Sequence, residues 1–187
     1  MRKINREIRV IRVFLTIIWI VRIFSLYLQK FNFNIDFNMQ VFLTGTVLET
    51  AQALDNRRLN KQIIECQQIL DAINGTGKGW FNHPVVHMYK NHAKWLQIYK
   101  WLLEEWREKR SDFLMLFHLD DYCTQHMPDF INETYLTNMK RRLYTKDNQH
   151  YKQWEDLGSS DINWYYVDGK WKKYKDGKCL GMFDEIC

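Results

Sequence analysis

Apolar residues between positions 55 and 110 recur every three or four residues, which is the spacing of one face of an α-helix. One series predicts a helix from Asp55 to Ile73: Leu59, Ile63, Cys66, Leu70 and Ile73. Another series predicts a helix from Pro84 to about Arg110: Val85, Met88, His92, Leu96, Tyr99, Leu103 and Trp106. The second helix would be about 40 Å long at about 1.5 Å per residue. These two helices are the expected framework of the core.

Polar residues mark where the helices begin and end. After the strand-like run MQVFL (residues 39–43), Thr46 and Glu49 form a T-x-x-E capping box for a short helix. Asp55 can cap the next helix, which Asn74 and the following glycine end. The glycine-rich stretch GTGKGWFNHP then predicts a loop whose backbone could approach a ligand closely.

The remainder of the chain predicts two more helices and a hairpin. SDFLMLFHLDDYCTQHM and TYLTNMKRRLY are the helical segments. WYYVDGKWKKY places two aromatic runs around an Asp-Gly pair, which is typical of a β-hairpin, and YKDGKCL repeats the turn signal. The expected fold class is mainly α: a single compact helical domain over residues 39–187, with a small C-terminal β-hairpin from about residue 162, preceded by an N-terminal extension, residues 1–38.

The extension differs from the body in charge and composition. It holds seven basic residues against two acidic ones, which equals the whole formal charge of +5, so the body is neutral overall. With 46% hydrophobic and 16% aromatic residues, the chain can bury one core. Any nucleic-acid affinity of the body must therefore come from local patches of charge.

Three interpretations of residues 1–38 stay open. VFLTIIWIV and IFSLYL, separated by Arg22, are short of the about 20 apolar residues of a membrane span, so residues 1–30 suggest a poor signal anchor or an interfacial helix. The abrupt change of composition before Met39 favours Met39 as the true first residue. The widely spaced cysteines, with no CxxC pair, favour a reducing cytoplasm, and membrane association through residues 1–30 is the alternative.

The predicted helix from Asp55 also carries a polar stripe beside its apolar one. Arg58, Lys61, Glu65 and Gln68 step by 3, 4 and 3. This stripe fits a solvated face with i, i+4 pairs such as Lys61 with Glu65. It also fits a carboxylate among the cations of Arg57, Arg58 and Lys61, beside a phosphodiester. The stripe alone does not decide between the two.

Three separated motifs change this picture. L-D-x-R-R-L-x-K-Q-x-x-E, G-W-x-N-H-P-x-x-x-M-Y and R-R-L-x-x-K-D-x-x-H-Y follow MQVFL in this order. The chain from Met39 to about Tyr151 thereby resembles the pyrimidine-dimer DNA glycosylase family, the small endonuclease V enzymes of phages and their bacterial relatives. The resemblance implies a compact, mostly helical, monomeric enzyme without metal or cofactor. Such an enzyme excises damaged or modified pyrimidines from double-stranded DNA and then nicks the abasic strand as an AP lyase.

The resemblance also implies the catalytic groups. The family's nucleophile is the α-amine at the chain start, here that of Met39, which attacks the sugar and leaves a Schiff base. Its partner acid corresponds to Glu65. An α-amine with a pKa of about 8 is partly neutral at pH 7, so it can act as a nucleophile. Gln40 is too large for the methionine before it to be trimmed, so the Met39 amine itself must serve; Lys61 is the weaker substitute.

The DNA contacts expected from the motifs and the neighbouring charge and aromatic residues are Arg57, Arg58, Lys61, Asn82, His83, Lys140, Arg141, Arg142, Lys146, Tyr151 and Trp154. His83 is expected to cap a helix or to face the site loop with Asn82. The tail aromatics Trp164, Tyr165 and Trp171 either stack on bases or pack against the core.

Two further observations concern metal binding and the choice of lesion. His83 and His87 have metal-ligand spacing, but no third ligand follows, so no metal site is expected. Ile64 stands where the phage enzymes have an arginine, which leaves the lesion preference open. A DNA-binding module that has lost the chemistry, or a membrane-associated protein using residues 1–30, are the alternatives.

Overall fold

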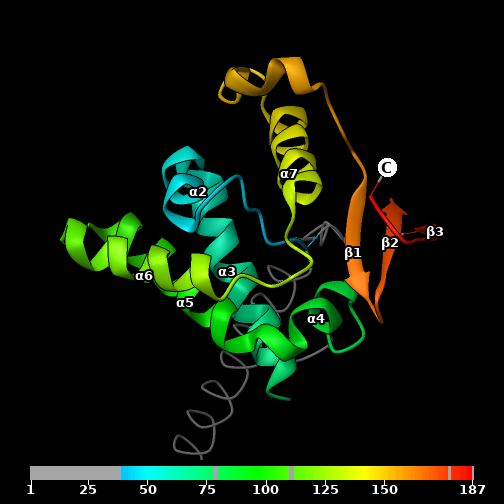
Figure 1. The fold of residues 1–187 in the computed structure, drawn as a ribbon, viewed down its shortest axis with the longest axis horizontal. Coiled ribbons are helices and arrows are strands. Elements are labelled where there is room, and N and C mark those ends of the chain that lie inside the picture. The colour runs from blue at the N-terminus through cyan, green and yellow to red at the C-terminus, as the bar shows by residue number, and fades with distance from the viewer. Residues whose placement is uncertain (1–38, 78–79, 110–111, 177, 187) are drawn as a thin grey trace, which may run out of the picture. The chain divides into compact units, whose positions relative to one another are not determined.

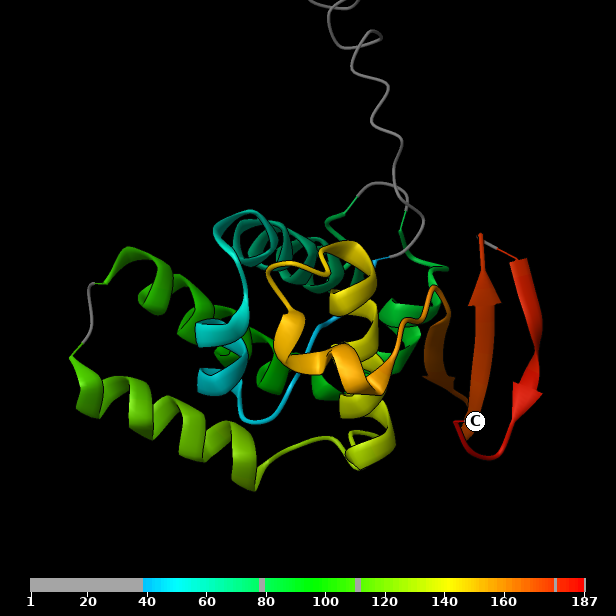
Figure 2. The same cartoon turned by 90° about the horizontal axis from the view of Figure 1, so that it is seen from above.

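The structure, a computed structural model, describes residues 39–77, 80–109, 112–176 and 178–186. Residues 38–187 form one compact unit. Its elements, in chain order, are α2 (Val47–Ala53), α3 (Asn56–Ile73), α4 (Pro84–Tyr89), the 3₁₀ turn η1 (Lys90–His92), α5 (Ala93–Glu108), α6 (Phe113–Gln125), α7 (Glu133–Lys146), the 3₁₀ turn η2 (Lys152–Leu157), β1 (Asn163–Val167), β2 (Lys170–Lys175) and β3 (Lys178–Phe183). The mainly α fold with a small C-terminal sheet is confirmed (Figures 1 and 2). The predictions for residues 1–38 lie outside the described residues.

The helix starts follow the local capping signals. Thr46 and Glu49 form the predicted capping box of α2, and the Asp55 side chain accepts a hydrogen bond from the amide of Arg58 at the start of α3. The Nδ1 atom of His83 accepts from the amide of Val85 at 3.2 Å, so His83 caps α4. Each cap satisfies a backbone N–H that the first helical turn leaves without a partner.

The prediction of a single long helix from Pro84 to about Arg110 is wrong. The chain forms α4, breaks at η1, and continues as α5. The break lets the two helices reach different neighbours: both contact α3, but α4 lies against β1 whereas α5 lies against α2 and α6. The 3₁₀ turn keeps the apolar residues three or four apart, so the hydrophobic period cannot reveal the break.

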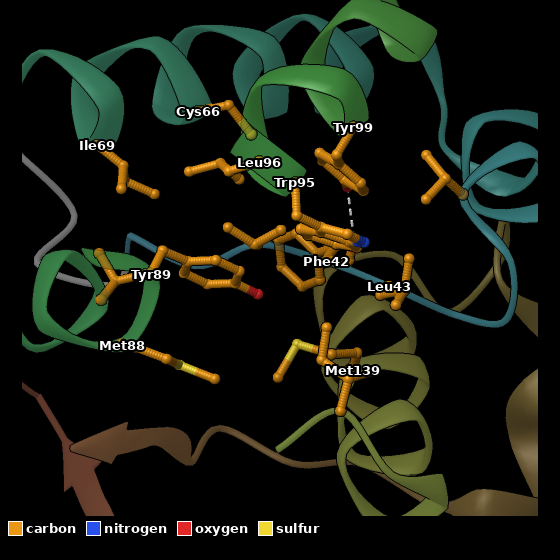
Figure 3. Packing of buried hydrophobic residues seen from close by; sticks show 14 of the residues in the cluster. Phe42, Leu43, Cys66, Ile69, Met88, Tyr89, Trp95, Leu96, Tyr99 and Met139 are labelled. Carbon is orange, nitrogen blue, oxygen red and sulfur yellow. Dashed lines mark hydrogen bonds between the residues drawn. The ribbon is translucent and has the colours of Figure 1, made fainter. Parts of the chain in front are cut away.

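The strand predicted for residues 39–43 is also wrong. This stretch, called here the threaded segment, is buried and irregular, and it pairs with none of the strands that the structure describes. Figure 3 shows it running between Tyr99 on α5 and Met139 on α7. An apolar run has the same appearance whether its backbone partners come from a neighbouring strand or from side chains.

Side chains from four elements bind the backbone of the threaded segment. Gln62 on α3 donates from Nε2 to the Gln40 carbonyl at 3.1 Å, and its Oε1 accepts from the Phe42 amide at 2.9 Å. The remaining bonds come from tyrosine hydroxyls, which donate to backbone carbonyls: Tyr165 to Met39 at 2.9 Å, Tyr135 to Val41 at 2.6 Å and Tyr99 to Phe42 at 2.5 Å. Buried peptide groups need such partners to avoid a desolvation penalty.

The C-terminal hairpin is confirmed and extended by a third antiparallel strand, in the order β1-β2-β3. Asp168 (φ 56°) and Gly169 (φ 77°) make the predicted tight turn in the left-handed region. Trp171 stacks on Tyr135 of α7, with ring centroids 5.9 Å apart. Trp164, Tyr165 and Trp171 are all buried. Of the two roles predicted for these tail residues, the structure therefore shows packing against the core.

An ionic cluster ties the start of α3 to the chain after α7. Tyr151 donates from its hydroxyl to Asp55 Oδ2 at 2.8 Å, and Nη1 of Arg58 lies 2.5 Å from the same oxygen. The Arg58 guanidinium also lies 3.6 Å from the Asp147 carboxylate and 5.3 Å from the centre of the Tyr151 ring. Burial opposes ionisation of Asp55, but the hydrogen bonds from Arg58 and Tyr151 outweigh it and lower its pKa from 3.8 to about 2.

Tyr99→Phe tests the side-chain pairing of the threaded segment. Removing the hydroxyl leaves the buried Phe42 carbonyl without its donor, so we expect the free energy of unfolding to fall by about 1–3 kcal/mol. Tyr122→Phe is the control, because it removes the same atom from a half-buried ring on α6 and should change stability by less than about 0.5 kcal/mol. Urea unfolding of both variants measures the difference; equal losses would contradict this account.

Asp55→Asn tests the ionic cluster through pH. Because the pKa of Asp55 is lower in the folded protein than in the unfolded chain, its carboxylate stabilises the fold above about pH 4, and that stability is lost as the pH falls from about 4 to about 2. Asparagine keeps the helix cap without the charge. We expect lower stability at neutral pH and a shallower decline between pH 4 and 2, measured by denaturant unfolding, with Tyr151→Phe intermediate. A decline as steep as that of the parent would refute the assignment.

Candidate functional site

Glu65 lies on α3 where the buried and exposed faces of the helix meet. The next residue, Cys66, is fully buried, whereas Ile64 is 58% exposed. Glu65 itself is 7% exposed, and its Oε1 lies 3.6 Å from Nζ of Lys61, whose side chain is 47% exposed. The predicted i, i+4 pair is present, but the carboxylate is not on a solvated face. It lies at the rim of the core with a cation beside it that reaches solvent.

Tyr165 on β1 binds the threaded segment and is influenced by the charge of Glu65. Its hydroxyl donates to the carbonyl oxygen of Met39 at 2.9 Å. Burial raises the pKa of this phenol, the guanidinium of Arg142 lowers it, and the carboxylate of Glu65 raises it further. Glu65 therefore lies within electrostatic range of the residue that binds the Met39 backbone. Gln62, one turn before Glu65 on α3, also bonds the threaded segment.

The loop before α4 forms a wall of this site. The His83 ring contacts the rings of Trp80 and Tyr165 edge to face, with centroids 5.4 Å and 5.5 Å apart. His83 thus has both predicted roles, as a helix cap and beside the loop, while Asn82 is exposed. Met39, Glu65, Trp80, His83 and Tyr165 are called the Tyr165 site below.

Arg142 is an internal residue of the fold. It is 3% exposed, and its Nη1 donates to the Ile162 carbonyl at 3.2 Å and to Oδ1 of Asn163. These bonds hold the start of β1 against α7. Its charge also lowers the pKa of Tyr135, a phenol whose pKa burial raises to about 12. In this structure, Arg142 faces the protein and not solvent.

The other predicted DNA contacts divide by exposure. Arg58 and Tyr151 belong to the ionic cluster with Asp55, and the Trp154 ring stacks on Tyr151 at a centroid distance of 5.4 Å. Lys140 and Arg141 are half-buried, and Nη2 of Arg141 donates to the Ser159 carbonyl at 3.3 Å. The predicted contacts with exposed side chains are Arg57, Lys61, Asn82 and Lys146.

Other kinds of site find no support in the described residues. Within them, no three His, Cys, Asp or Glu side chains are grouped so as to hold a metal ion. No helix among the described elements is long and apolar enough to cross a membrane. A cavity of about 520 Å³ is open between α5 and α6, lined by residues such as Trp101, Leu114 and Tyr122, but no predicted site residue lines it.

Tyr165 and Gln62 were not predicted as site residues. Gln62 does stand in the first of the three motifs, between Lys61 and Glu65, where an amide in the buried half of a helix indicates a backbone partner. Tyr165 stands among the aromatic residues of the hairpin, and its contact with Met39 joins residues 126 positions apart. No local sequence pattern indicates a contact of that range.

Comparison with known proteins agrees with the motifs. A sequence model described as pyrimidine dimer DNA glycosylase matches residues 39–117. No curated protein and no solved structure matches the chain. The matched residues run from the threaded segment into α6, and they include Met39, Glu65 and the loop before α4, but not α7 or the sheet. Over residues 39–117 this chain is similar to the pyrimidine dimer DNA glycosylases, a family of DNA repair glycosylases, which confirms the family predicted from its motifs.

Proposed function

We propose that the body of this protein is a DNA glycosylase with AP-lyase activity, which excises damaged or modified pyrimidines from double-stranded DNA. The observation that carries this proposal is the Tyr165 site, where a single tyrosine binds the Met39 backbone and lies within range of the Glu65 carboxylate. A backbone nitrogen and a carboxylate at the rim of the core are the two groups that amine-dependent base excision requires.

The proposed reaction uses the α-amine of Met39, in a chain whose first residue is Met39. The neutral amine attacks C1′ of the damaged nucleotide, and the bond between C1′ and the base breaks, with the electron pair leaving on the base. The Glu65 carboxylate stabilises the positive charge on the sugar and accepts the proton that the amine loses. The bond between C1′ and the ring oxygen then breaks; the ring oxygen keeps the electron pair and takes back the proton from Glu65, which leaves a protonated Schiff base. Removal of a proton from C2′ then expels the 3′ phosphate by β-elimination.

Exposed cations on α3 and α7 are the charges proposed to contact DNA. Lys61 is exposed and pairs with Glu65, and Arg57 is exposed one turn earlier on α3. Lys146 is exposed at the end of α7. The body is neutral overall, so binding to phosphates must depend on local cations. We assign the phosphate contacts to these three residues and to the half-buried Lys140 and Arg141. Arg58 and Arg142 instead stabilise the fold that presents them.

Covalent trapping tests the chemistry. A chain released with Met39 as its first residue, incubated with a duplex that contains one abasic site and with borohydride, should form a stable protein–DNA adduct. Glu65→Gln should slow processing of a pyrimidine-dimer duplex by at least about 100-fold. Glu104→Gln is the matched control, because Glu104 pairs with Lys100 on α5 at 3.0 Å in the same i, i+4 geometry and should leave the rate unchanged.

Three outcomes would refute this mechanism. An untrapped Met39 chain that binds the duplex would be a DNA-binding module without chemistry. Full activity in Glu65→Gln would remove the acid from the mechanism. Loss of trapping in Lys61→Gln, with the Met39 amine present, would identify Lys61 as the nucleophile in place of that amine.

Salt dependence tests the proposed phosphate contacts. Binding that neutralises phosphates weakens as salt rises, and each lost contact lowers the slope of log K against log salt by about 0.9. Arg57→Gln should lower the slope by about that amount. Lys94→Gln, an exposed cation on α5 that lies over the Tyr122 ring of α6, should leave it unchanged. Fluorescence anisotropy with duplex DNA between about 50 and 200 mM salt measures both, and equal slopes in Arg57→Gln and the parent would exclude Arg57 as a contact.

A further inference from the structure

We infer that Tyr165 is a positioning residue for the nucleophile: its hydroxyl sets where the α-amine of Met39 lies relative to Glu65. This inference rests on the proposed function, and it assigns to the C-terminal sheet, outside the matched residues 39–117, a part in the chemistry.

The first step is covalent geometry. The Met39 carbonyl accepts the Tyr165 hydroxyl at 2.9 Å. Two bonds of about 1.5 Å join the carbonyl carbon to the nitrogen through Cα, which places that nitrogen about 2.5 Å from the carbonyl carbon. With the carbonyl held, rotation about the single Cα–C bond is the torsion that moves the amine. A bond at this carbonyl therefore restricts the nucleophile more closely than a bond at any later peptide group.

The second step is the rigidity of the tyrosine itself. Tyr165 is 2% exposed, and its ring is held edge-on by two neighbours, His83 and Tyr174, with centroids 5.5 Å and 5.4 Å away. Tyr174 lies on β2, which pairs with β1 in antiparallel register, and His83 is fixed as the cap of α4. The hydroxyl is thus presented from a ring with little freedom to turn, as a positioning group requires.

The third step separates Tyr165 from the other tyrosines that bind the threaded segment. Tyr135 makes the equivalent hydroxyl-to-carbonyl bond at Val41, at 2.6 Å, and it is equally buried. Val41 lies two residues after Met39, so the bond from Tyr135 to the Val41 carbonyl holds the segment in place without fixing the Met39 nitrogen. Tyr135 therefore provides a matched comparison in which the same atom is removed from the same kind of bond.

The experiment compares Tyr165→Phe with Tyr135→Phe in the chain that begins at Met39. Single-turnover rates of borohydride trapping are measured at saturating abasic duplex and across pH, together with the dissociation constant for DNA and the free energy of unfolding. Displacement of a reacting group by about 1 Å can cost about 100-fold in rate. We expect Tyr165→Phe to slow trapping by about 10- to 100-fold with an unchanged dissociation constant. Tyr135→Phe should slow it by less than about threefold despite a similar loss of stability.

The pH dependence of the trapping rate separates a positioning role from a loss of stability, because lower stability does not change the pH midpoint of that rate. If Tyr165 acts on position alone, the plateau rate falls while the midpoint set by the amine stays where the parent has it. Equal rates in Tyr165→Phe and the parent, or equal slowing in the two variants in proportion to lost stability, would overturn the inference. A parent chain that binds abasic DNA but forms no adduct would refute the proposed function itself, and the inference with it.

Discussion

The fold depends on a buried stretch of backbone whose polar groups need partners. The threaded segment passes between α5 and α7, where no strand lies alongside to form a ladder (Figure 3). Three tyrosine hydroxyls and one glutamine amide bind it instead, from α3, α5, α7 and β1. Because each donor comes from a different part of the chain, satisfying this one segment fixes how those elements lie against each other, and through Gln62 it holds α3, the helix that carries Glu65, against the segment.

The cations of the body have two different uses, which their local sequence does not distinguish. Arg58 and Arg142 bind carboxylate, carbonyl and amide oxygens inside the protein. These contacts join α3 and β1 to α7 and the residue that follows it. Lys61 and Arg57 extend into solvent from the same face of α3 that holds Glu65. A neutral body can still carry positive charge locally, where exposed cations such as Lys61 and Arg57 lie on one helix.

The parts of the structure that depend on neighbours three or four residues apart could be predicted from the sequence. The caps at Thr46 and Asp55 and the turn at Asp168 are of this kind, as are the two faces of α3. The break before α5 escaped because a 3₁₀ turn preserves the hydrophobic period. The internal role of Arg142 escaped because its acceptors lie about twenty residues later, where the sequence shows the charge but not what surrounds it.

The bond between Tyr165 and Met39 has a consequence for biosynthesis. It joins positions 126 residues apart, so the front of the body cannot be seated until the last strands have left the ribosome. Until then the nascent amino end has only the partners already translated, and enzymes that process new chains can reach it. Removal of the residues before Met39 is thus easier before the sheet is complete than afterwards, when the Met39 carbonyl is already held by Tyr165.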